Sequence, residues 1–197
     1  LQKLHKGTHA DIAELLHNIG DTCMDLYQIK EGLGCYQQAL LMYQHLYRGN
    51  HFVIARLLDK VGAAYMELGQ TKEALKYFKE TLTLFRESDR CDHAAVATLL
   101  THLGSAYRGL GDFEKGLGYY QQALVMFQNL YDGNHPAIAN LIPMGKSLYN
   151  LANTYMELGY PDEALKYFTD ALGIFKTLYD KSGPDVASSY YGIGVAY

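Results

Sequence analysis

Histidines and cysteines have the greatest capacity for catalysis or metal binding in this sequence of 197 residues. Four of the eight histidines recur at regular intervals of 42 residues, at His9, His51, His93 and His135. This regular recurrence favours a structural role for these histidines, such as capping the helix that follows. Cys91 stands close to His93, but a zinc site needs a second pair of ligands at suitable spacing, and the sequence offers none.

The three cysteines, Cys23, Cys35 and Cys91, are too few for a small secreted scaffold held by disulfides. We interpret them as reduced thiols, with Cys23 and Cys35 packed in the core. The sequence contains no phosphate loop, nucleophile elbow, HExxH motif or dinucleotide fingerprint. We therefore expect a cytoplasmic protein that is not an enzyme and that binds no metal and no cofactor.

The composition is that of a folded chain with an unusual share of two residue types. Apolar residues make up 49% and charged residues 19%, and the formal net charge is −4. A chain with this charge balance does not have the uniformly basic surface of nucleic-acid binders. No apolar run reaches the roughly 20 residues that span a bilayer. We expect neither a nucleic-acid nor a membrane partner. The surplus lies in 19 glycines and 18 tyrosines.

An internal repeat accounts for much of that surplus. Gly20, Gly62 and Gly104 lie 42 residues apart, and other positions recur in step with them. Each unit reads as two amphipathic helices joined by a short turn, because apolar residues follow i, i+3, i+4, i+7 spacing. The recurring small, aromatic and apolar positions include Gly32/Ala74/Gly116/Ala164, Tyr36/Phe78/Tyr120/Phe168, Ala39/Thr81/Ala123/Ala171 and Cys23/Tyr65/Tyr107/Tyr155.

The repeat resembles the tetratricopeptide repeat (TPR), whose pattern is W-x2-L-G-x2-Y…A-x3-F. The second unit carries this pattern, with leucine in place of tryptophan, at Leu58, Val61, Gly62, Tyr65, Ala74 and Phe78. The length of the repeat and the Asn-His-Pro connector are similar to the kinesin-light-chain and nephrocystin-like subclass. The resemblance implies an all-α, right-handed superhelical solenoid of antiparallel helix pairs that binds protein segments. It implies no particular ligand.

We expect a single array over residues 1–197. Its parts are the end of a preceding repeat (1–9), four repeats (10–50, 51–92, 93–134 and 135–182) and the first helix of a fifth (183–197). The fourth repeat carries six extra residues near 140–146, which rotate a helix by about 240° beyond whole turns. Pro143 also removes a backbone donor. We predict a break or sharp kink around Asn140–Gly145.

The resemblance places the first helices on a concave surface, with polar side chains facing the groove. An asparagine amide both donates and accepts, which suits the main chain of an extended peptide. Because acids and bases are mixed at these positions, the charge of a ligand does not follow. The candidate groove residues are Asn18, Asp21, Arg56, Lys60, His102, Ser105, Arg108, Tyr149, Asn150 and Asn153.

The known clamp for the acidic tails of chaperones is missing. It needs Lys or Arg where this sequence has His17, Asp59, Thr101 and Tyr149, so we predict no binding of such tails.

Three functions stay open at this point. The first is a scaffold that binds a peptide or a partner helix in the groove. The second is a spacer or self-association segment, because the last helix presents Tyr190, Ile193 and Tyr197 with no second helix to cover them, and repeat arrays need polar caps. The third is a sensor array of a nucleotide-binding signalling protein.

Overall fold

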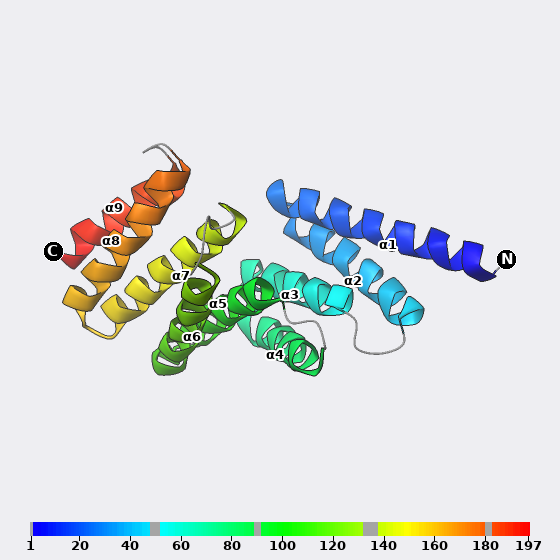
Figure 1. Cartoon of the computed structure of the whole chain (residues 1–197), viewed down its shortest axis with the longest axis horizontal. Coiled ribbons are helices and arrows are strands. Elements are labelled where there is room, and N and C mark those ends of the chain that lie inside the picture. The colour runs from blue at the N-terminus through cyan, green and yellow to red at the C-terminus, as the bar shows by residue number, and fades with distance from the viewer. Residues whose placement is uncertain (1, 48–51, 89–91, 132–137, 180–182) are drawn as a thin grey trace. The chain divides into compact units, whose positions relative to one another are not determined.

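The computed structural model describes residues 2–47, 52–88, 92–131, 138–179 and 183–197, and these residues form helices and no strands. The fold is an all-α helical-repeat solenoid (Figure 1). In chain order the helices are α1 (Gln2–Asp25), α2 (Ile29–Leu46), α3 (Phe52–Glu67), α4 (Thr71–Glu87), α5 (His93–Gly109), α6 (Phe113–Tyr131), α7 (Ile138–Glu157), α8 (Pro161–Leu178) and α9 (Pro184–Ala196).

Successive helices pack as hairpins: α1 with α2, α3 with α4, α5 with α6, and α7 with α8. A turn of three residues joins the two helices of each hairpin, so they run antiparallel. The second helix of one repeat also lies against the first helix of the next, as α2 does against α3, α6 against α7 and α8 against α9. The chain forms two compact units, Leu1–Cys91 with α1 to α4 and Asp92–Tyr197 with α5 to α9.

The hairpin turns depend on one residue with left-handed backbone geometry. Gly69, Gly111 and Gly159 have φ values of 71°, 80° and 81°, and Tyr27 takes the equivalent place in the first repeat with φ 58°. The amide N–H of the following residue donates to the carbonyl five residues back, at 2.8–3.0 Å in all four turns. This bond satisfies a carbonyl that the end of the first helix leaves open. Only the first repeat places a side chain at this strained position.

In three hairpins a glycine of the first helix faces an aromatic ring of the second at close range. A Cβ atom added at Gly62 would lie 2.5 Å from the Phe78 ring, which is completely buried. The same relation joins Gly20 to Tyr36 and Gly104 to Tyr120. The missing side chain therefore lets the two helices approach until the ring fills the space between them.

The first helix differs from the expected division of the chain. Residues 2–9, which we expected to end a preceding repeat, belong to α1, which is one helix of 24 residues. His9 therefore lies inside a helix and not in a connector.

At the start of α5 the capping side chain is Asp92, whose Oδ1 accepts a hydrogen bond from the Ala95 N–H at 3.1 Å. His51, Cys91 and the connector with His135 lie outside the described residues.

The prediction around Asn140–Gly145 was a break or a sharp kink, and the break was wrong, because α7 is one helix with Pro143 inside it. Pro143 is the sixth residue of the helix, so its missing N–H removes one hydrogen bond close to the end of the helix, where the first four N–H groups have no partner within the helix. The buried positions Leu141, Gly145, Leu148 and Ala152 form one continuous stripe. Both halves of α7 therefore face the core, and the extra residues lengthen the first helix, which has 20 residues here and 16 in α3.

Candidate binding surface

Four of the candidate groove residues lie on α1 and α3 of the first unit, and two of these four bond to each other. Asp21 accepts a hydrogen bond from the Tyr36 hydroxyl at 2.6 Å and one from the Lys60 ammonium group at 2.7 Å. Burial alone would raise the pKa of Asp21, but the bonds from Lys60 and Tyr36 outweigh it and lower that pKa. Burial and the bond to Asp21 raise the pKa of Tyr36. Asp21 is therefore a carboxylate whose Oδ1 atom accepts both of these hydrogen bonds within the protein.

The second unit has the equivalent arrangement on α5 and α7. The Ser105 hydroxyl accepts from the Tyr120 hydroxyl at 2.9 Å and from the Asn150 side-chain amide at 3.5 Å. Arg108 and Glu157 form a second link between the same two helices, an ion pair at 3.2 Å. In both units a polar residue of one first helix thus joins the tyrosine of its own hairpin to the next first helix.

These two clusters show which residues the sequence interpretation missed. Tyr36 and Tyr120 stand in a position that we assigned only to aromatic packing, but their hydroxyls complete the clusters. The sequence contains a signal for them. The aromatic residue is a tyrosine where the first helix offers Asp21 or Ser105, and it is Phe78 where the first helix has Ala63. The fourth repeat does not follow this signal, because Asn153 stands there with Phe168.

The exposed candidates Asn18 and Arg56 meet at a pocket of about 360 Å³ in the first unit. Glu14, His17 and Asn18 enter it from α1, and Arg56 enters from α3. The Arg56 guanidinium lies 5.9 Å from the centre of the Phe52 ring and forms no ion pair within the described part of the chain.

Glu14 and His17 complete the chemistry of this pocket. Glu14 supplies an acidic acceptor one helical turn from Asn18. Burial, opposed by the charge of Asp21, lowers the pKa of His17, so its ring is neutral at pH 7. The His17 Nε2 atom is buried and has no hydrogen-bond partner in the described structure. The pocket thus combines donors and acceptors of both charges in one place.

The remaining candidates are less available to a ligand. Tyr149 packs on Phe168 with ring centres 5.4 Å apart, so its ring belongs to the core of the second unit. The Asn153 side-chain amide donates to the Tyr149 carbonyl of its own helix at 3.0 Å. His102 is half-buried on α5. The structure therefore brings only Asn18 and Arg56 together at an open pocket.

A second set of contacts explains the abundance of tyrosine. Tyrosines twelve residues apart stack across the hairpin turn, with ring centres 5.3–5.5 Å apart and planes within 14° of parallel. The pairs are Tyr65–Tyr77, Tyr107–Tyr119 and Tyr155–Tyr167. The hydroxyls of Tyr65 and Tyr155 also accept hydrogen bonds from Gln37 and Gln121 of the preceding second helix. These tyrosines therefore join helices both within and between repeats.

Comparison with known proteins agrees with this repeating geometry. The sequence profile of the tetratricopeptide repeat matches residues 11–87, 90–142 and 144–197. The chain belongs to the tetratricopeptide-repeat family. No curated protein matches this TPR chain significantly. Within its described residues no helix is both long and apolar enough to cross a membrane.

Solved structures share the fold of the TPR chain at low sequence identity. The kinesin light chain TPR-like repeats of Podosopora anserina are 18% identical with a TM-score of 0.71, over 96% of this chain and 86% of that one. BtubC from P. vanneervenii is 22% identical with a TM-score of 0.76, over 96% and 73%. A Rap protein complexed with competence and sporulation factor is 16% identical with a TM-score of 0.77, over 94% and 48%. The resemblance to kinesin-light-chain repeats is thus confirmed at the level of the fold.

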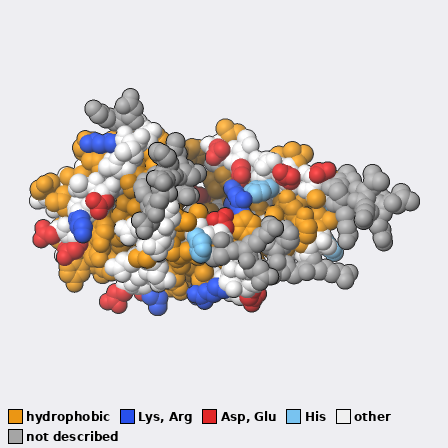
Figure 2. All heavy atoms as spheres, in the orientation of Figure 1, with side chains coloured by type: hydrophobic (Ala, Val, Ile, Leu, Met, Phe, Trp, Pro, Cys, Tyr) orange, Lys and Arg blue, Asp and Glu red, His pale blue; other side chains and the backbone are white. Residues whose placement is uncertain are grey.

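Charged side chains of both signs are mixed on the described part of the face that Figure 2 shows. On the face in Figure 2, lysine and arginine side chains lie beside aspartate and glutamate. The ion pairs Lys76–Glu73 and Lys115–Asp112 illustrate this mixing on second helices.

The first repeat departs from the tyrosine pairs, because Cys23 and Cys35 occupy the two positions. Both thiols are half-buried and free. Replacing both cysteines by tyrosine should restore the stacked pair and raise the free energy of unfolding by about 0.5–1.5 kcal/mol, since an aromatic pair adds this much beyond area burial. Urea denaturation of the wild type, the two single variants and the double variant measures the coupling. A double variant less stable than the wild type would contradict the prediction.

Proposed function

We propose that this TPR chain binds an extended segment of a partner protein on the face formed by the first helices α1 and α3 of its first unit. TPR arrays are protein-interaction scaffolds, and the fold is generally not catalytic. The observation that carries the proposal is the pocket between α1 and α3, where Glu14, His17, Asn18 and Arg56 converge. It acts as an anchoring point for the bound segment.

The groups in this pocket suit a peptide main chain. Each peptide unit presents one N–H donor and one carbonyl acceptor. Glu14 offers an acceptor for the N–H, while the Arg56 guanidinium and the Asn18 amide offer donors for the carbonyl. Arg56 and Asn18 are exposed, so a ligand reaches them without rearrangement of the core. The Rap protein complexed with competence and sporulation factor shows that this fold can hold a binding partner.

The residues tied into the two clusters act as supports for this surface. Asp21 and Lys60 hold α1 and α3 at the spacing that forms the pocket, since their 2.7 Å ion pair joins the two helices directly. In the second unit, the hydrogen bond between Ser105 and Asn150 likewise joins α5 to α7. We assign these four residues to positioning and assign direct ligand contact to Asn18 and Arg56.

The test is selection of binders from a random peptide library displayed on phage, with the wild-type chain as bait. The affinity of a selected peptide is then measured for the double variant Asn18→Ala, Arg56→Ala. We expect a loss of at least tenfold, because two hydrogen-bonding groups are removed. The matched control is Lys30→Ala, Gln38→Ala, which changes two exposed residues of α2 outside the pocket. Equal affinity of the wild type and the pocket variant, or the absence of any selected peptide, would overturn the proposal.

A further inference from the structure

The pocket between α1 and α3 contains two charges of opposite sign. Its lining consists of Ala10, Glu14, His17 and Asn18 of α1, Tyr43 and Tyr47 at the end of α2, and Val53 and Arg56 of α3. Because the ring of His17 is neutral at pH 7, Glu14 and Arg56 are the charged groups of this lining. The carboxylate therefore belongs to the α1 wall of the pocket and the guanidinium belongs to the α3 wall.

Neither charge is neutralised within the part of the chain that the structure describes. There Glu14 and Arg56 form no ion pair, either with each other or with another residue. The neighbouring charges behave differently, because Asp21 and Lys60 pair with each other at 2.7 Å. Glu14 and Arg56 are both exposed, so water solvates them while the pocket is open.

Binding of a protein segment removes that water. The bound segment of the proposed function lies over the pocket, and its main chain forms hydrogen bonds with the groups that line it. Hydrogen bonds to a neutral main chain leave the two net charges without a counter-charge. Covering an ionised group without a counter-charge costs free energy, and placing a like charge beside it costs more. A segment that fits this pocket therefore brings one negative and one positive group of its own.

The negative group of the segment belongs at Arg56. The Arg56 guanidinium carbon lies 5.9 Å from the centre of the Phe52 ring, a contact that limits the positions open to this long side chain. A planar guanidinium can donate two parallel hydrogen bonds to one carboxylate. The Asn18 side-chain amide stands in the same pocket and stays available for a main-chain carbonyl. The matching residue of the segment is therefore an aspartate or a glutamate.

The positive group of the segment belongs at Glu14. The rings of Tyr43 and Tyr47 stack with centres 6.0 Å apart and planes 18° from parallel. Burial raises the pKa of Tyr43, and the charge of Glu14 adds to this effect, which places the Glu14 carboxylate near the Tyr43 hydroxyl. A lysine or arginine side chain would pair with the carboxylate beside the tyrosine rings, whose faces also attract cations. The matching residue of the segment is therefore basic.

We propose that the bound segment carries one acidic and one basic residue two positions apart, with the acid at Arg56 and the base at Glu14. This inference rests on the proposed function. The pocket has a volume of about 360 Å³, that of a cube about 7 Å on each side, and two steps of an extended chain cover about 6.6 Å. Side chains two positions apart also point to the same side of such a chain, so both reach one pocket.

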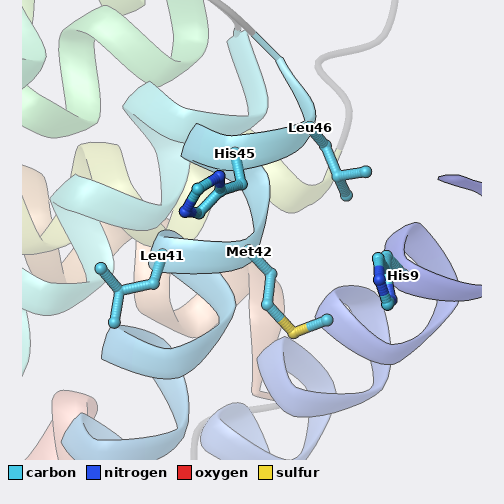
Figure 3. A pocket seen from close by; sticks show the side chains of 5 residues that line it. All are labelled: His9, Leu41, Met42, His45 and Leu46. Carbon is cyan, nitrogen blue, oxygen red and sulfur yellow. The ribbon is translucent and has the colours of Figure 1, made fainter.

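The pocket in Figure 3 differs in its chemistry, although α1 and α2 also line it. It has a volume of about 520 Å³ and is lined by His9, Leu41, Met42, His45 and Leu46. The Met42 side chain reaches from α2 toward α1, on the side where His9 lies. None of these five lining residues is an aspartate, a glutamate, a lysine or an arginine. The demand for two opposite charges is thus a property of the α1–α3 pocket.

The experiment starts from peptides selected on phage with the wild-type chain. One selected peptide is synthesised in two forms, as selected and with its acidic and basic residues exchanged. Both forms are titrated with the wild type and with the double variant Glu14→Arg, Arg56→Glu, which reverses both charges and keeps the net charge. The matched control is Lys30→Glu, Glu31→Lys, which reverses two exposed charges of α2 outside the pocket.

We expect the selected peptides to share an acid and a base two positions apart. The charge-reversed variant should bind the original form at least tenfold more weakly than the wild type does, because both contacts become repulsive. It should bind the exchanged form with an affinity within about threefold of that between the wild type and the original form. The control should bind the original form as the wild type does.

Two results would overturn the inference and leave the proposed function intact. The first is a set of peptides whose affinity depends on Asn18 and Arg56 but which lack the charged pair. The second is a charge-reversed variant that has the circular dichroism of the wild type and either binds the original form unchanged or fails to bind the exchanged form. A library that yields no peptide at all contradicts both the inference and the proposed function.

Discussion

Replacing Phe78 by alanine should lower the free energy of unfolding by about 3–5 kcal/mol, the cost observed when a large buried aromatic side chain is truncated. The ring is 0% exposed and fills the space between α4 and the glycine of α3. The backbone at Gly62 carries no side chain that could move into the cavity. The two helices are also held by the neighbouring apolar contacts, so collapse would be incomplete.

Urea denaturation followed by circular dichroism measures this loss. Tyr191→Ala serves as the control, since Tyr191 is 74% exposed on α9 and its removal should change stability by about 0.5 kcal/mol or less. A loss below 1 kcal/mol for Phe78→Ala would mean that the hairpin is not held together by this ring.

Adding one methyl group opposite the same ring should also destabilise the protein. Gly62→Ala places a Cβ atom 2.5 Å from the Phe78 ring, a distance that forces the ring or the helix to shift. Overpacking of this kind costs about 1–3 kcal/mol. The intrinsic preference of alanine for a helix returns about 1 kcal/mol, so the net effect is a loss only if the contact is as close as the structure shows.

Gly34→Ala is the matched control, because Gly34 lies inside α2 and an added Cβ would meet nothing within 4 Å. This variant should be more stable than the wild type by about 0.5–1 kcal/mol. The double variant Gly62→Ala, Phe78→Ala should lose less than the sum of its parts, since the new methyl group enters the cavity left by the ring. Strict additivity, or stabilisation by Gly62→Ala alone, would refute the close contact.

The repeat pattern predicted most of the fold because the same physical constraint returns in every unit. Two recurring features determine how the helices of a unit pack: a glycine opposite an aromatic ring, and a left-handed glycine at the turn. Recurring positions such as Gly62 and Gly69 therefore define hairpins. The break expected at Pro143 was wrong because the prediction assumed that both segments of the helix had to keep the register of the repeat. In fact Leu141 and Gly145 continue the buried stripe of the later part.

The binding surface was less predictable from the sequence. Asp21, Lys60, Ser105 and Asn150 have the polar character of groove residues, but their hydrogen bonds are used between helices. Which polar groups stay open depends on side-chain partners in the next repeat, and the pattern of a single unit does not contain this information. Glu14 joins the pocket only because α3 brings Arg56 beside it.

The alternation of tyrosine and phenylalanine in the buried aromatic position has a consequence for the period of the sequence. Tyr36 and Tyr120 carry the hydroxyls that join successive first helices, while Phe78 and Phe168 have none. The sequences around them alternate in the same way, with CYQQAL at 35–40 and YYQQAL at 119–124, but EALKYF at both 73–78 and 163–168. The sequence therefore repeats most closely with a period of two units, and each compact unit contains one hairpin of the tyrosine type and one of the phenylalanine type.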